Sequence, residues 1–183
     1  MRIRKSILVG LVSMLVLCMT GCGENNAEIK EAGETIVDNT MSLKTKKVIK
    51  VLNEDDDDYD VNADFVDMLF SDVSDEIDMD DVEWEIKKVD VEVSGKKNNK
   101  AELTYVIELE GEEYDYVLGL INEDDEWIIE DNKEYFLNTY VLYIEILLNE
   151  GDKGVKKDLK EMYKDGDYDD YREMAEDIYE DML

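Results

Sequence analysis

The chain has 183 residues, of which 50 are acidic and 20 are basic, so its formal net charge at pH 7 is -30. Such an acidic balance excludes a nucleic-acid-binding role, because phosphate recognition needs clustered lysine and arginine side chains. The sequence contains no histidine and only two cysteines, which excludes Ser/His/Asp triads, Cys/His dyads and the common zinc sites.

A short basic and apolar segment opens the chain. Arg2, Arg4 and Lys5 form a positively charged start, and an apolar run follows over residues 7–17. This run is too short for a membrane-spanning helix, which needs about 20 residues. The pattern predicts a signal peptide over residues 1–21, whose three cations take the net charge from -30 to -33 when they are removed.

The two cysteines differ in the residue that precedes each of them. Signal peptidases cut after a small residue, so Gly21 qualifies Cys22 as the first mature residue, whereas Leu17 disqualifies Cys18. The stretch MTGC, residues 19–22, resembles the lipobox of bacterial lipoproteins, with methionine where leucine is more usual. The resemblance implies that Cys22 is lipidated. The alternative is a plain secretory signal with an incidental cysteine.

The lipobox also implies a location, the extracytoplasmic face of the cell membrane. The lipid has to be the anchor, because anionic headgroups repel a chain of this charge. Lysine far outnumbers arginine, a bias typical of AT-rich genomes, which indicates a low-GC monoderm bacterium.

Helical patterns follow a polar start of the mature chain. Residues 22–35 contain glycine and lack apolar periodicity, so we expect a flexible tether there. Apolar residues then recur at helical spacing over 37–52 and again over 61–73, which predicts two amphipathic helices. The acidic run EDDDDYD, residues 54–60, is expected to form a solvated loop between them.

The apolar period changes to two after residue 81. Alternating runs over 82–93, 101–109, 114–120 and 127–129 are separated by turn residues and predict a four-stranded antiparallel meander. The alternation changes phase at Lys87 and Lys88, which predicts a β-bulge.

Helices before a meander that ends in DDEWIIED resemble nuclear-transport-factor-2-like (NTF2-like) or cystatin-like exported domains. The resemblance covers residues 36–131 and implies an α+β fold in which the sheet wraps a helix. In that superfamily the concave face can host small ligands, or simply pack and dimerise. Five aromatic residues are candidates to line such a hollow here: Trp84, Tyr105, Tyr114, Tyr116 and Trp127. The alternative is an aromatic core with cross-strand pairs.

The last part of the chain, residues 132–183, is expected to be helical and to pack on the sheet domain. Residues 132–150 are apolar nearly all round, with Asp131 and Glu134 as a start signal and Gly151 as a stop signal. We expect the sheet and two further helices to cover this segment. The alternative is an exposed groove or a homodimer seam.

The stretch DGDYDDYREMAE, residues 165–176, resembles an EF-hand calcium loop. Carboxylates stand at the first, third, fifth, ninth and twelfth positions of that loop, which suits a hard cation with oxygen ligands. These candidate Ca²⁺ ligands are Asp165, Asp167, Asp169, Glu173 and Glu176. Asp170 replaces the usual glycine, so a plain acidic turn is the alternative.

These observations favour a lipid-anchored extracytoplasmic module that binds a ligand, a peptide or another envelope protein without catalysing a reaction. Two alternatives stay open: a calcium-dependent adhesion or sensing module, and an enzyme that uses Asp, Glu and Tyr side chains on the sheet. The identity of the ligand, the oligomeric state and the biological process do not follow from the sequence.

Overall fold

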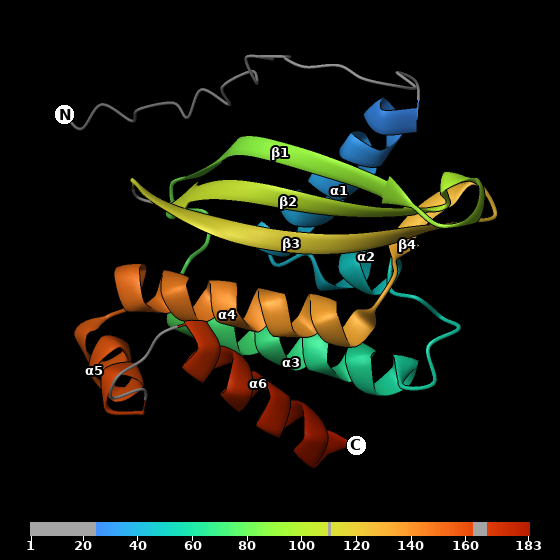
Figure 1. Ribbon diagram of the computed structural model, residues 1–183. Coiled ribbons are helices and arrows are strands. Elements are labelled where there is room, and N and C mark those ends of the chain that lie inside the picture. The colour runs from blue at the N-terminus through green and yellow to red at the C-terminus, as the bar shows by residue number, and fades with distance from the viewer. Residues whose placement is uncertain (1–24, 110, 163–167) are drawn as a thin grey trace.

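The computed structural model describes residues 25–109, 111–162 and 168–183. Over these residues the chain adopts an α+β fold, as predicted, in which helices pack against one face of a four-stranded antiparallel sheet (Figure 1). None of the helices in these ranges combines the length and the apolar character needed to cross a membrane.

The sheet is a meander in the order β1-β2-β3-β4, which confirms the predicted strands. Its strands are β1 (Trp84–Ser94), β2 (Lys100–Leu109), β3 (Glu112–Glu123) and β4 (Glu126–Ile129). The register of β1 against β2 shifts between Ile86 and Lys88, so the predicted bulge is confirmed as well.

Tight turns connect the strands. Asp124 and Asp125 join β3 to β4 with φ values of 50° and 71°, and two positive φ values are what a two-residue hairpin loop of type I′ requires. Between β1 and β2, Gly95 at φ 80° precedes the short 3-10 helix η1 (Lys96–Asn98). The sheet is therefore built from local connections alone.

The N-terminal helical part differs from the prediction in two ways. Helix α1 (Asn25–Met41) begins well before residue 36, and Ile29 in its second turn is fully buried. The flexible tether predicted over 22–35 is therefore wrong from residue 25 onward, because this stretch buries an apolar side chain in the core. The chain then turns at Leu43, which has a φ of 49°, so the single helix predicted over 37–52 is divided and continues as α2 (Thr45–Ile49).

Helix α1 crosses beneath the curved sheet in close contact with β2 (Figure 1). The contact is close because Gly33 has no side chain. A Cβ atom at this position would lie 2.2 Å from the Tyr105 hydroxyl oxygen and 2.7 Å from Cδ2 of Leu103. Gly33, one of the two glycines on which the predicted tether over residues 22–35 was based, is thus a packing residue.

We expect Gly33→Ala to lower the free energy of unfolding by about 1–3 kcal/mol, because an added methyl overpacks the core. At an uncrowded helix position the same change raises stability by about 1 kcal/mol. Urea unfolding measures the difference. Gly154→Ala is the helical control, since its Cβ would be less crowded and would lie 3.0 Å from Oδ1 of Asp152. A Gly33→Ala chain as stable as the wild type would contradict the close contact.

The remaining helices pack below α1 and the sheet (Figure 1). They are α3 (Tyr59–Glu76), α4 (Asn132–Glu150), α5 (Lys153–Met162) and α6 (Tyr168–Met182). The bounds of α4 agree with the prediction, and the Asp131 side chain caps it by accepting a hydrogen bond from the Glu134 backbone N–H at 2.9 Å. Helix α4 contacts β3, α3, α5 and α6, so the expected cover of this apolar helix is provided within the chain.

Candidate functional site

The five aromatic residues predicted to line a hollow do share one face of the sheet. Strand register places Trp84 opposite Leu109, and Tyr105 opposite Tyr116. In β2 and β3 these positions belong to the alternating set that is buried against the helices. The period of two therefore identified the helix-facing side of the sheet correctly.

The centre of this face is a packed core. Tyr105 and Tyr116 are 0% and 2% exposed, and both contribute to the main hydrophobic cluster. This placement agrees with the aromatic-core alternative. Trp84 and Tyr114 are partly buried at one end of the sheet, and Trp127 lies in β4 at the other end.

Hydrogen bonds of hydroxyl groups in this core join α4 to the sheet and to α1. Tyr116 Oη is 3.0 Å from Thr139 Oγ1 of α4, and Thr40 Oγ1 of α1 is 2.7 Å from Tyr135 Oη of α4. Tyr143 donates its hydroxyl proton to the Thr40 carbonyl oxygen. These bonds satisfy polar groups that would otherwise destabilise a closed interior. We call Thr40, Tyr116, Tyr135, Thr139 and Tyr143 the tyrosine–threonine cluster.

Burial governs the ionisation of these tyrosines. Removal from water raises the pKa of Tyr116, Tyr135 and Tyr143 well above the ordinary value of a phenol, because the phenolate loses its hydration. Burial also raises the pKa of Tyr105, whose hydroxyl has no hydrogen-bond partner among the described residues. All four stay neutral near pH 7, so they are poor proton acceptors, and Tyr116, Tyr135 and Tyr143 act as hydrogen-bonding core residues.

A smaller polar group lies where β3 begins beside the end of α4. The Tyr114 hydroxyl donates to Glu112 Oε2 at 2.9 Å and accepts from Nδ2 of Asn149 at 2.6 Å. Burial, followed by the hydrogen bond to Glu112, raises the pKa of Tyr114 to about 12. Burial and then the charge of Glu112 raise the pKa of Glu145 on α4.

We expect Glu145→Gln to stabilise the chain at neutral pH. The folded state holds a proton on Glu145 more readily than the unfolded state, so wild-type stability rises as the pH falls through the raised pKa. The advantage of the variant should therefore shrink as the pH falls and vanish once the carboxyl is protonated in both states. Melting temperatures measured across this pH range test the expectation.

The control is Glu150→Gln, which removes one negative charge from an exposed position of the same helix. It reports how much relief of the net negative charge contributes by itself. An equal gain from the two variants at neutral pH would show that the burial of Glu145 plays no part.

The predicted calcium loop is not formed by the residues that the structure describes. Asp165 and Asp167 lie outside the described residues. Asp169, Glu173 and Glu176 all belong to the continuous helix α6. Helix α6 begins at Tyr168, the fourth position of the proposed loop. An EF-hand loop wraps around its ion through its first nine positions before its exit helix begins, so the prediction is wrong for Asp169 and Glu173. Glu176, at the twelfth position, would be helical in an EF-hand as well, so its place in α6 does not test the prediction. No cluster of three or more potential metal-ligating acids or cysteines occurs in the described parts of the chain.

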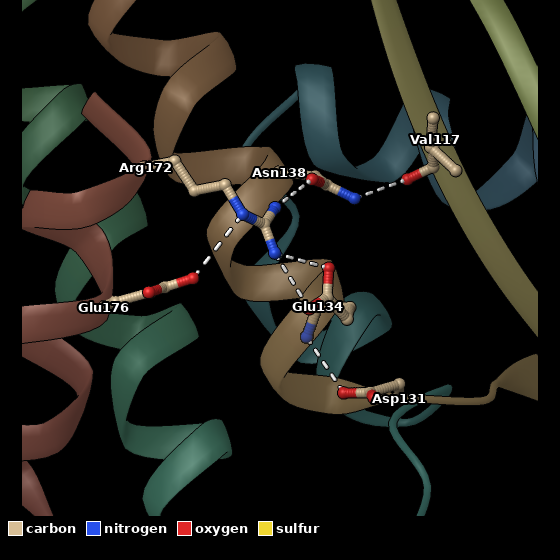
Figure 2. A network of polar contacts seen from close by, with 6 residues as sticks. All are labelled: Val117, Asp131, Glu134, Asn138, Arg172 and Glu176. Atoms are coloured by element: carbon tan, nitrogen blue, oxygen red, sulfur yellow. Dashed lines mark hydrogen bonds and ion pairs between the residues drawn. The ribbon is translucent and has the colours of Figure 1, made fainter. Parts of the chain in front are cut away.

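Glu176 instead takes part in a polar network between α4 and α6 (Figure 2). Arg172 Nη2 contacts both carboxylate oxygens of Glu134 at 2.8 Å, and its Nη1 donates to Asn138 Oδ1 at 3.0 Å. Glu176 is 3.5 Å from Arg172 Nε, and Asn138 Nδ2 donates to the Val117 carbonyl oxygen of β3 at 3.0 Å. The planar guanidinium thus connects α6 to α4, and Asn138 continues the connection to the sheet.

A feature that the sequence analysis did not identify is a shallow, open hollow on α5. It is lined by Lys153, Lys156, Lys157, Lys160 and Glu161. The lysines follow an i, i+3, i+4, i+7 spacing, and this spacing could have indicated in the sequence that they share one helix face. Four acids, Glu150, Asp152, Asp158 and Glu161, balance them within the same stretch, so the hollow is no basic patch.

Comparisons with known proteins add little to this geometry. No protein-family model matches the chain, and no curated protein matches its sequence. Among solved structures, one similar chain is described as a "Putative NTF2-like transpeptidase" from Campylobacter jejuni. It is 11% identical, and the similarity covers 55% of this chain and 95% of that chain with a TM-score of 0.40. A likeness at this level carries no conclusion about the chemistry of the present chain.

Proposed function

We propose that the chain is a lipid-anchored extracytoplasmic lipoprotein whose folded part binds another polypeptide without catalysing a reaction. The observation that carries the anchoring is the MTGC stretch after a basic and apolar start, with Cys22 as the lipidated residue. Among the described residues, helix α1 begins at Asn25, three positions after Cys22.

The architecture supports the proposal that the folded part is an exported domain of the NTF2-like or cystatin-like kind. The element order is the one on which the resemblance was based, with helices before a meander that ends in a Trp-containing strand. Helix α1 lies against the concave side of the sheet, as expected for a sheet that wraps a helix (Figure 1). We therefore propose that the described part of the chain has this kind of fold.

The closed packing of the helix-facing side of the sheet supports a binding role over catalysis. The tyrosine–threonine cluster occupies the region where a ligand hollow was expected, and its hydroxyls are bonded to one another or to backbone. Glycoside hydrolysis, the carboxylate chemistry best suited to such a chain, needs two acids facing each other across a cleft. The closed face favours recognition through an outer surface instead.

Mass spectrometry of the chain isolated from cell envelopes tests the anchoring. We expect the mature protein to begin at Cys22 and to carry the added mass of a lipid on that residue. A mature chain that begins elsewhere, or at an unmodified Cys22, would refute it. The binding role is tested by capture from the same envelopes on the immobilised chain, where recovery of no specific polypeptide would refute it.

A further inference from the structure

Strand β1 forms a free edge of the sheet. It is the terminal strand in the order β1-β2-β3-β4, and within the described ranges no strand pairs with its outer side (Figure 1). Along a free edge, alternate backbone N–H and C=O groups point away from the sheet and are available to another strand. Extended polypeptides bind to such edges in many recognition domains.

An apolar row on β1 is only partly covered. On the helix-facing side, its residues Trp84, Ile86, Val89, Val91 and Val93 all keep intermediate exposure. Their partners on β2 are buried at 2% exposure or less: Leu109, Ile107, Tyr105, Leu103 and Ala101. An added strand with apolar side chains on this side would cover the row on β1 and gain hydrophobic stabilisation.

The bulge divides this edge into two parts. Around Lys87 the strand is irregular, and irregular edges disfavour pairing. Residues 88–94 pair with β2 without interruption, so their outer side is regular and long enough for a short strand. The regular part, 88–94, is therefore the portion of the edge that suits a partner.

Charge on the opposite, solvent-facing side indicates what kind of strand fits. Glu92 lies directly across from Glu102 of β2 in the register, and like charges in this position destabilise a strand pair. No cation is paired with either carboxylate in the described parts of the chain, whereas Lys88 pairs with Asp90. A basic residue on an added strand next to Glu92 would relieve this repulsion.

We propose that the regular part of the β1 edge, residues 88–94, binds an extended segment of another polypeptide in which apolar and basic residues alternate. The apolar residues cover Val89, Val91 and Val93, and a basic residue faces Glu92. The inference rests on the proposed binding function and names its surface and partner chemistry. A second copy of the chain is the less suitable occupant, because two copies with a net charge of -30 each repel one another.

The test uses the purified full chain in neutral detergent and a synthetic peptide of alternating valine and lysine. We expect saturable binding at constant ionic strength, and slowed hydrogen exchange of amides in β1. The control peptide has the same sequence with N-methyl groups on alternate backbone amides, which removes strand hydrogen bonds and keeps the charge. Equal binding of both peptides, or none of the unmethylated one, would overturn the proposal.

Two variants locate the site. Val91→Lys is expected to weaken peptide binding about tenfold, because it replaces apolar cover by a repelling cation. Glu92→Lys is expected to weaken binding about two- to fivefold through the lost cross-strand charge pair. The control Glu113→Lys makes the same charge change at an exposed position of β3. If it weakens binding as much as Glu92→Lys, net charge alone explains the affinity and the edge site is wrong.

The peptide comparison on the wild-type chain decides the question even where a variant folds poorly. Sedimentation supplies a further outcome: a dimer that Val91→Lys dissociates would place a second copy on the edge and overturn the proposed partner. Failure of this inference is distinguishable from failure of the proposed function. A polypeptide captured equally well by the wild-type chain and by Val91→Lys would leave the binding role intact and exclude the β1 edge.

Discussion

Replacing Cys22 by alanine is expected either to release the chain from the membrane fraction into the medium or to leave it unprocessed, with its signal segment retained. The physical reason is that the proposed anchor is the lipid on Cys22. A net charge of -30 is repelled by anionic headgroups, so charge does not hold the chain at the membrane. We therefore expect a chain that is processed without a lipid to lose its attachment.

Fractionation followed by detection with an antibody measures this effect, and Cys18→Ala is the matched control. Cys18 follows Leu17, whereas Cys22 follows Gly21, so only the latter stands behind a residue that suits the cut. We expect the Cys18→Ala chain to distribute as the wild type does. The same distribution for both variants would refute Cys22 as the anchor.

Phe136→Ala is expected to lower the free energy of unfolding by about 3–5 kcal/mol, which is a large part of the stability of an ordinary domain. Phe136 on α4 is 1% exposed, and its ring centroid lies 4.5 Å from that of Phe65 on α3 and 6.0 Å from that of Tyr179 on α6. Truncation leaves a cavity at the point where the three helices meet.

Urea unfolding with a fitted midpoint and slope measures this loss. Met68→Ala on α3 is the control, because Met68 is 37% exposed and its truncation opens no cavity. We expect the control to change stability by about 0.5 kcal/mol or less. Equal losses from Phe136→Ala and Met68→Ala would mean that the aromatic contacts between the helices contribute little.

The sheet and α4 were predictable because each carries a strong local signal. Strict alternation identified the helix-facing residues of every strand, and the change of phase at Lys87 located the bulge to within a residue. For α4, an apolar segment between a capping aspartate and Gly151 defined both ends. In each case the residues that decide the structure are neighbours in the sequence.

The N-terminal helices were harder to predict because their boundaries depend on tertiary contacts. The first turns of α1 bury Ile29. In the sequence Gly33 indicates flexibility, and only the structure shows that Tyr105 packs against it. The break between α1 and α2 falls at Leu43, with neither glycine nor proline to mark it. Apolar residues on both sides of the break keep a spacing that suits one continuous helix.

The candidate site was also hard to predict, because it depends on tertiary contacts. Spacing alone placed carboxylates at calcium-loop positions, but Asp169 and Glu173 are helical, and Glu176 contacts Arg172. Alternation placed Tyr105 and Tyr116 on the correct face of the sheet without showing whether that face is open. The predicted meander order already placed the first strand at an edge of the sheet. The incomplete cover of its apolar row was beyond prediction, because an edge strand and a central strand can carry the same alternating pattern.

The early start of α1 has a consequence for how an anchored chain meets its partners. Only three residue steps separate Cys22 from Asn25, and a chain extends at most about 3.6 Å per residue. With lipid on Cys22, Asn25 at the start of α1 therefore stays within about 11 Å of the lipid attachment point. Such a domain diffuses with the bilayer in two dimensions, and its encounters are confined to a thin layer above the membrane. Within that layer a partner held at the same surface meets it at a high effective concentration, so weak contacts with such a partner can be sufficient for association.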